Sequence, residues 1–202
     1  MSEKHSVKLL RNYFILSYLV FWLLLALTGY LISLEVPMFL QTIMKNISAW
    51  APTFVIIIMY KKLYPNVTIK EYIKLHFGKK VNPWVFLITF ILQASVIAAV
   101  IIAFSLINNK PLSTLSYISI STIIPIFLID LTSGAMGEEL GWRGYALNFL
   151  QKKHTPLRSG LIVGIVWGFW HLPLMILSGY TGLELVYYIL AFMTAIISVS
   201  IV

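Results

Sequence analysis

Two acids and one base lie close together in the segment GAMGEELGWRGYAL, residues 134–147, and they are Glu138, Glu139 and Arg143. On a helix, Glu139 and Arg143 are four positions apart with the acid first, which is the favourable order for an ion pair. Glu138 points about 100° away from Glu139 around the helix axis, so one arginine need not serve both acids. We therefore expect Glu139 to pair with Arg143 and Glu138 to remain without a basic partner.

The surroundings of Glu138 make an unpaired carboxylate costly. Hydrophobic residues make up 59% of the chain and charged residues only 11%, against about 25% charged residues in an ordinary domain. A carboxylate in such a chain normally faces the protein interior or a water-filled cavity. There it could act as a general base on water. The alternative is that both acids and Arg143 only clamp neighbouring helices together.

A histidine is expected at the same depth as Glu138. Glu138 precedes Lys152 by fourteen residues, and His171 follows Arg158 by thirteen. On two antiparallel helices, both side chains would lie roughly 20 Å from the same membrane face. A carboxylate and an imidazole that meet there can hold and activate a water, with or without a metal. The alternative for His171 is a structural hydrogen bond.

The elements that must position these residues are apolar helices. Six runs are long enough to cross a bilayer, which takes about 20 residues, and they lie near Tyr13–Leu34, Phe39–Tyr60, Pro83–Ile107, Tyr117–Ala135, Gly160–Leu177 and Leu183–Val202. The sequence therefore predicts an all-α, multi-pass integral membrane protein. We expect one transmembrane domain over residues 1–202, a bundle of about six transmembrane helices.

The basic residues predict the orientation of these spans. One set precedes the first span or fills the second and fourth connections, and it consists of Lys4, Lys8, Arg11, Lys61, Lys62, Lys70, Lys74, Lys79, Lys80, Lys152, Lys153 and Arg158. The opposite side has only Lys45 and Lys110. Cytoplasmic loops are enriched in lysine and arginine, so the amino terminus is expected in the cytoplasm. The net charge of +8 then reflects topology and attraction to a lipid bilayer, and no nucleic-acid partner is expected.

The charged fourth span is expected to be unusually long. Nothing from Ser133 to Gln151 stops a helix decisively, so the pattern predicts one helix of about 35 residues that begins near Tyr117. On that helix Asp130 would share a stripe with Glu138 and could line the same cavity. Pro52, Pro125 and Pro173 are expected to kink their spans.

The fifth span has a small-residue face. Gly160, Gly164 and Gly168 repeat every four residues. Such a face lets a neighbouring helix approach closely.

The two motifs resemble those of a known family. EELGWR (Glu138–Arg143) fits the pattern E-E-x-x-x-R, and WGFWHLP (Trp167–Pro173) fits an aromatic residue followed four positions later by His. In this order and spacing, the chain resembles the CAAX-protease and bacteriocin-processing (CPBP, Abi) family of intramembrane endopeptidases.

The resemblance implies roles for the matching residues. Glu138 would be the base that activates the attacking water, and Glu139 and Arg143 would complete the first motif. His171 would help to bind the water or polarise the scissile carbonyl. Trp167 stands where the family often has Phe, and it is a candidate for substrate binding together with Asp130. The resemblance also implies an optional cofactor, Zn²⁺, with Glu138 and His171 as its ligands.

One family motif is missing from the chain. The resemblance implies a third motif, a His followed four residues later by Asn or Asp, but no histidine follows His171. We therefore expect the chain to be carboxy-terminally incomplete relative to the family.

Three functions remain open at this point. The first is hydrolysis of a peptide bond in a membrane-tethered substrate, for which the resemblance suggests a prenylated polypeptide or a bacteriocin-related peptide. The second is a non-catalytic bacteriocin-immunity or self-protection protein that uses the same cavity. A proton-coupled transporter ranks below both, because the two halves of the sequence show no internal symmetry.

Overall fold

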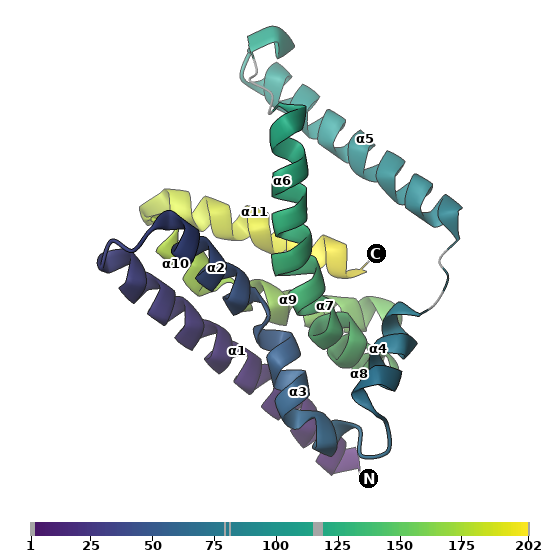
Figure 1. The fold of residues 1–202 in the computed structure, drawn as a ribbon. Helices are drawn as coiled ribbons and strands as arrows, with labels where there is room; N and C mark the ends of the chain where they lie inside the picture. Colours follow the sequence, from purple (N-terminus) through teal and green to yellow (C-terminus); the bar gives the residue numbers. More distant parts are fainter. Residues whose placement is uncertain (1–2, 79, 81, 115–118, 202) are drawn as a thin grey trace. The chain divides into compact units, whose positions relative to one another are not determined.

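The computed structural model describes residues 3–78, 80, 82–114 and 119–201 (Figure 1). All regular elements among these residues are helical. The bounds of the first part are α1 (Glu3–Ser33), α2 (Met38–Ala49), α3 (Ala51–Leu63), α4 (Ile69–Phe77), α5 (Pro83–Ile107), a 3₁₀ turn η1 (Leu112–Thr114) and α6 (Ile120–Asp130). There follow a π-helix η2 (Leu131–Ala135), α7 (Met136–Gly141), a π-helix η3 (Trp142–Leu147), α8 (Asn148–Gln151), α9 (Pro156–Trp170), α10 (Leu172–Leu177) and α11 (Gly182–Ile201). The predicted all-α class is confirmed.

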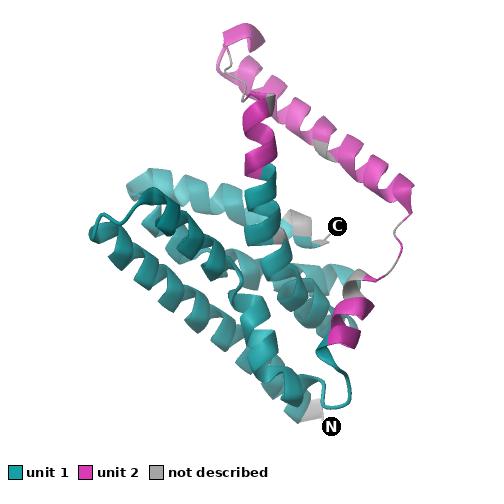
Figure 2. Cartoon of the chain, in the orientation of Figure 1, with its two compact units in different colours: residues 1–69, 127–202 teal, residues 70–126 magenta. Residues whose placement is uncertain are grey.

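The chain divides into two compact units (Figure 2). Unit 1 comprises residues 1–69 and 127–202, and unit 2 comprises residues 70–126. All residues of the two motifs belong to unit 1. The expectation of one transmembrane domain over residues 1–202 stays a prediction.

Several helices have the length and composition of membrane spans. Three qualify alone among the described residues, at His5–Ser33, Pro83–Ile107 and Pro156–Leu177, and α2 with α3 would form a fourth if the bent pair is one span. Of the predicted spans, Pro83–Ile107 coincides with α5. The fourth begins at Tyr117, which lies outside the described residues, and the sixth corresponds to α11, whose residues Gly182–Ile197 form an apolar helix.

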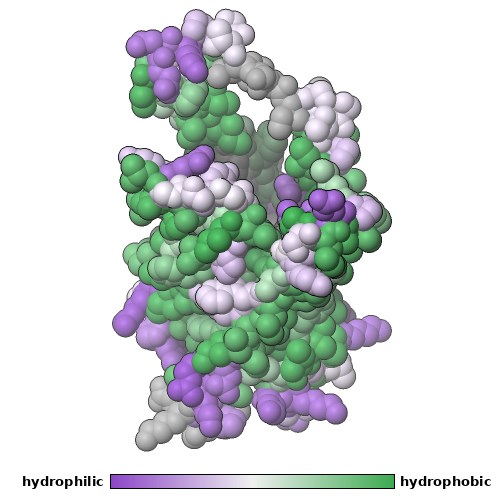
Figure 3. All heavy atoms as spheres, turned by 90° about the vertical axis from the view of Figure 1, so that its left-hand side faces the viewer, coloured by the Kyte–Doolittle hydropathy of each residue, from purple (hydrophilic) through white to green (hydrophobic). Residues whose placement is uncertain are grey.

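Hydrophobic residues cover much of the face shown in Figure 3, and hydrophilic residues lie along its lower end and in patches higher up. α1 explains how this arises. Leu9, Tyr13 and Phe21 face the core, while Leu19 and Leu23 on the other side of the same helix are exposed. A helix that is apolar on all sides is typical of a membrane span rather than of a soluble surface helix.

Two of the predicted spans are interrupted close to a proline. α2 and α3 meet at an angle of 44°, with Trp50 between them and Pro52 in the first turn of α3. α9 ends at Trp170, and α10 begins one residue before Pro173. Proline cannot donate the backbone hydrogen bond of a continuous helix. The predicted kink at Pro52 is therefore confirmed. The kink predicted at Pro173 stays a prediction, and so does that at Pro125, where α6 continues through the proline.

The charged segment is helical throughout residues 120–151, but it is not a uniform α-helix. The expectation of one long helix agrees with this continuous helical segment, but at η2 and η3 the backbone widens into π-helix. A π-helical segment inserts an extra residue and rotates everything that follows it around the axis. Asp130 is exposed whereas Glu138 is buried, so the predicted stripe that would bring Asp130 into the cavity of Glu138 stays a prediction.

Glycines let two helix pairs approach closely. A Cβ added at Gly137 would lie 2.8 Å from the Trp50 ring, and one at Gly141 would collide with Tyr13 and Pro52. A Cβ at Gly164 would lie 2.8 Å from Cα of Ile197 on α11. The predicted close approach of a helix to the glycine face of α9 is confirmed, and the neighbour is α11.

An aromatic cluster joins α1 to the motif-bearing segments. Tyr13, Trp142 and Trp170 are fully buried. The Trp142 ring lies 5.9 Å from Tyr13 and 5.8 Å from Trp170, centre to centre, and Trp170 stacks on Phe21. Aromatic side chains bury much apolar area each. This cluster therefore fixes the positions of η3 and the end of α9 against α1.

Candidate active site

Glu138 and His171 meet in the interior of unit 1. Glu138 lies on α7 and His171 at the junction of α9 and α10, and both side chains are buried. Oε2 of Glu138 is 4.0 Å from Nε2 of His171. The two helices thus place the carboxylate and the imidazole at the same depth, as the sequence predicts.

Both residues line one cavity of about 230 Å³. Its wall also includes Phe21 and Leu25 of α1 and Trp170, which is apolar surface, and Ser133 and Gly134 of η2. A mostly apolar pocket with a few convergent polar groups is typical of a small-molecule or peptide site. The cavity is large enough for several waters or for part of a peptide.

Two further contacts fix the orientation of the pair. The indole N–H of Trp167 donates a hydrogen bond to Oε2 of Glu138. Nδ1 of His171 lies 2.9 Å from the carbonyl oxygen of Trp167. A carbonyl only accepts, so Nδ1 carries the proton of the neutral ring and Nε2 presents its lone pair toward Glu138.

The second acid of the motif has a different partner. Nη1 of Arg143 donates to Oε1 of Glu139 at 2.9 Å, and both side chains are partly exposed. The guanidinium also lies over the Trp167 ring, 4.0 Å from its centre. The predicted division, with one glutamate paired to Arg143 and the other free of it, is confirmed by these contacts. Arg143 therefore contacts Trp167, the residue whose indole N–H donates to Glu138.

Asp130 lies apart from this arrangement. Its side chain is exposed at the end of α6, and it is not among the residues that line the cavity of Glu138. The proposed substrate-binding role of Asp130 stays a prediction without support from its position. Trp167 has an assigned contact, the hydrogen bond to Glu138, and its role in substrate binding also stays a prediction.

The sequence reasoning missed three polar residues of the cavity, Lys45 and Asn46 on α2 and Ser133 on η2. A signal was present, because a lysine inside a predicted span normally faces a cavity or a partner and marks function.

The donor set for zinc is incomplete among the described residues. Catalytic zinc sites use three protein ligands. Glu138 and His171 provide two, and the described part of the chain contains no group of three His, Cys, Asp or Glu that could hold a metal ion. These residues do not by themselves fit a zinc site, so no chemical step is derived through zinc.

Comparison with known proteins supports the family resemblance. Residues 119–202 match the family described as Type II CAAX prenyl endopeptidase Rce1-like, and this range contains both motifs. A protein of Methanococcus maripaludis named CAAX prenyl protease 2 is 29% identical over 160 residues, which are 75% of this chain and 59% of that relative. The match thus spans less than two thirds of the relative's length. In its two motifs and over residues 119–202, the chain is therefore similar to the CAAX-type prenyl endopeptidases.

Proposed function

We propose that this protein is an intramembrane endopeptidase that hydrolyses a peptide bond with a water activated by Glu138. The observation that carries the proposal is the pair of Glu138 and His171 in one cavity, 4.0 Å apart. That distance is too long for a direct hydrogen bond. The separation suits one water molecule that donates one hydrogen to Glu138 Oε2 and the other to His171 Nε2.

The reaction needs no covalent enzyme intermediate. Glu138 accepts a proton from the water while the water oxygen bonds to the carbonyl carbon. The tetrahedral intermediate collapses with cleavage of the C–N bond, and Glu138 returns the proton to the leaving nitrogen. The lone pair of His171 Nε2 orients the water, and the Trp167 hydrogen bond keeps the carboxylate in place.

The negative charge that develops on the carbonyl oxygen during the reaction must be stabilised by hydrogen-bond donors. Lys45 and Asn46 line the same cavity and come from α2, a different element from those that carry Glu138 and His171. An ammonium and an amide N–H are suitable donors to an oxyanion. We assign these two side chains to that role.

The substrate class follows from the family and from the apolar surroundings. The relative's name, CAAX prenyl protease 2, supports a prenylated or otherwise membrane-tethered polypeptide as substrate. A bacteriocin-related peptide has no support beyond the family resemblance. We also propose that the amino terminus is cytoplasmic, on the distribution of lysine and arginine alone. Zn²⁺ remains a proposal that would require further ligands beside Glu138 and His171.

The test is hydrolysis of a prenylated peptide by the full-length protein in liposomes. Glu138→Gln keeps the size of the side chain but removes the base, so turnover should fall by at least about a hundredfold. The matched control is Glu184→Gln, which changes an exposed acid at the start of α11 and should leave turnover unchanged.

Two results would contradict the proposal. One is full activity of the Glu138→Gln variant. The other is protection of cells against a bacteriocin by both wild type and Glu138→Gln, with no peptide cleaved by either. The second result would favour the immunity-type binding protein.

A further inference from the structure

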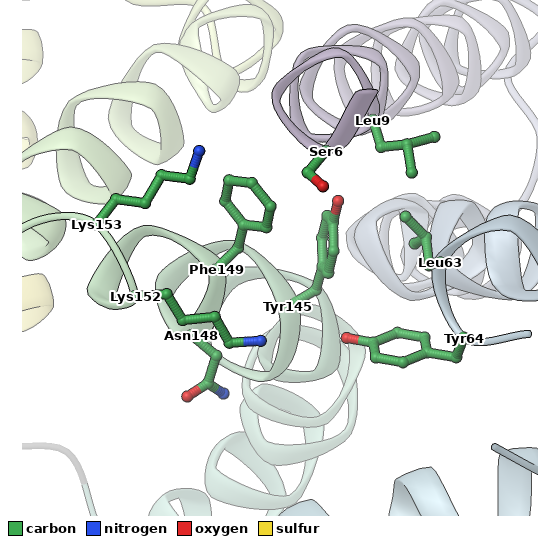
Figure 4. A pocket seen from close by; sticks show the side chains of 9 residues that line it. All are labelled: Ser6, Leu9, Leu63, Tyr64, Tyr145, Asn148, Phe149, Lys152 and Lys153. Carbon is green, nitrogen blue, oxygen red and sulfur yellow. The ribbon is translucent and has the colours of Figure 1, made fainter. Parts of the chain in front are cut away.

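Outside the candidate active site, a pocket of about 460 Å³ lies at the end of unit 1 that carries the amino terminus (Figure 4). It lies between the first turns of α1, the end of α3 and the segment from η3 to the residues after α8. The polar groups on its wall include Tyr64, Tyr145, Asn148, Lys152 and Lys153. None of these residues takes part in the proposed peptide hydrolysis.

The pocket is basic. In Figure 4 the ammonium end of Lys152 and the hydroxyl of Tyr64 point toward one another across the pocket. A second recess of about 520 Å³ shares Leu9 with the first and adds His5, Lys8 and Lys62. None of the described residues that line either recess is Asp or Glu. The local field therefore favours an anion.

The rest of the wall is apolar. Leu9 and Leu63 line the same pocket as the lysines, and Phe149 lies beneath Lys153, whose Nζ is 5.7 Å from the centre of its ring. A small soluble anion would leave this apolar surface uncovered. A molecule with an anionic head and an attached apolar chain would cover both kinds of surface.

The position along the helices fits the membrane–water interface. The pocket lies at the end of α1, a helix long and apolar enough to cross a bilayer, and Lys152 and Lys153 follow the charged segment where it leaves the apolar region. Basic pockets between transmembrane helices on the cytoplasmic side are typical binding sites for anionic lipid headgroups.

We propose that this pocket binds the phosphate headgroup of an anionic phospholipid, with Lys152 and Lys153 as its main cationic partners. The bound lipid would join α1, α3 and the charged segment. Tyr145 lies on the pocket wall and contacts both Tyr13 of α1 and Tyr64, with ring centres 5.0 and 6.3 Å apart. Occupancy of the pocket should therefore raise the unfolding temperature.

The experiment compares the full-length protein in nanodiscs of phosphatidylcholine with nanodiscs that also contain phosphatidylglycerol. Retained lipid is measured by native mass spectrometry, and the unfolding temperature by a thermal scan. The test variant is Lys152→Gln with Lys153→Gln. The matched control is Lys61→Gln with Lys74→Gln, which removes the same charge from exposed lysines that line neither recess.

Loss of the two pocket lysines should weaken lipid binding more than loss of the two control lysines. Each lysine near a membrane surface strengthens the attraction to anionic lipid roughly fivefold, so loss of both should weaken phosphatidylglycerol binding about thirtyfold. Wild type and the control should retain the lipid and the rise in unfolding temperature. Equal losses in test and control variants would mean diffuse attraction and would overturn the site.

Two further measurements accompany this experiment: one distinguishes a lipid from a soluble anion, and the other covers the case of a poorly folded double variant. Inorganic phosphate is added to phosphatidylcholine nanodiscs, and a full rise in unfolding temperature there would overturn the lipid assignment in favour of a soluble anion. The single variant Lys152→Gln, measured in parallel, should lose part of the binding even if the double variant is poorly folded; unchanged lipid retention by a folded Lys152→Gln would count against the proposal. Neither readout uses peptide hydrolysis, so the outcome does not depend on the proposed function.

Discussion

The indole N–H of Trp167 donates a hydrogen bond to Oε2 of Glu138, and the same oxygen is the one that faces His171 Nε2. The backbone carbonyl of Trp167 meanwhile lies 2.9 Å from His171 Nδ1. One residue thus orients both members of the proposed catalytic pair, through its side chain and through its backbone.

Replacement of Trp167 by Phe tests the side-chain contact alone. The variant keeps an aromatic ring for Arg143 but has no N–H for Glu138, so the carboxylate loses an anchor that is worth about 1.5–3 kcal/mol when the acceptor is charged. We expect kcat for peptide hydrolysis to fall about tenfold or more, with KM little changed. Trp84→Phe, at an exposed tryptophan, is the control. If kcat stays at the wild-type value, the hydrogen bond has no role in positioning Glu138.

The pair of Glu139 and Arg143 should contribute little free energy by itself. Both side chains are partly exposed, and exposed ion pairs are worth about 0.2–1 kcal/mol. A double-mutant cycle with Glu139→Gln and Arg143→Gln, measured by chemical unfolding, should give a coupling free energy in that range. A coupling of about 3 kcal/mol would instead indicate a fully desolvated pair.

Arg143→Lys tests whether the planar guanidinium contributes to stability beyond its positive charge. Lysine retains the positive charge but loses the planar guanidinium that lies over the Trp167 ring. We expect the variant to lose about 0.5–1 kcal/mol of stability.

Lys45 should act in the transition state. Lys45→Met keeps the length of the side chain but removes the donor, and loss of one oxyanion donor typically lowers kcat by about a hundredfold or more. Because the donor acts on charge that develops during the reaction, KM should change little. Steady-state kinetics in liposomes give both constants, and Lys110→Met, which does not line the cavity, is the control. A rise in KM with unchanged kcat would show that Lys45 binds the substrate in its ground state.

The two glycines of α9 should differ in their tolerance of alanine. At Gly164 the added Cβ would lie 2.8 Å from a backbone atom of Ile197, which cannot move without α11. At Gly168 it would meet the flexible end of Met193. We expect Gly164→Ala to lower the free energy of unfolding by about 1–2 kcal/mol. Gly168→Ala should be nearly neutral, because alanine favours the helix.

Chemical unfolding of the two alanine variants decides this point. Met193→Ala should relieve any residual cost of Gly168→Ala and should not relieve that of Gly164→Ala. Equal destabilisation by both alanines would mean that α9 and α11 pack less closely than the contacts indicate.

The sequence by itself determined the local features of this protein. Apolar runs of span length predict membrane helices, and the bounds of α5 agree residue for residue with the predicted span. The order and spacing of Glu139 and Arg143 predict their ion pair, because residues four apart on a helix are neighbours wherever that helix lies. The common depth of Glu138 and His171 follows from their distances to basic residues at one membrane face.

Only the tertiary structure decided which side chains share the cavity. The hydrogen bond from Trp167 to Glu138 and the presence of Lys45 and Asn46 depend on how three helices are rotated about their axes. The π-helical segments η2 and η3 change that rotation within the charged segment, and no local pattern in residues 131–147 predicts them. Rotation is set by contacts between distant residues, such as Gly141 against Tyr13 and Pro52, and a pattern confined to one helix does not contain that information.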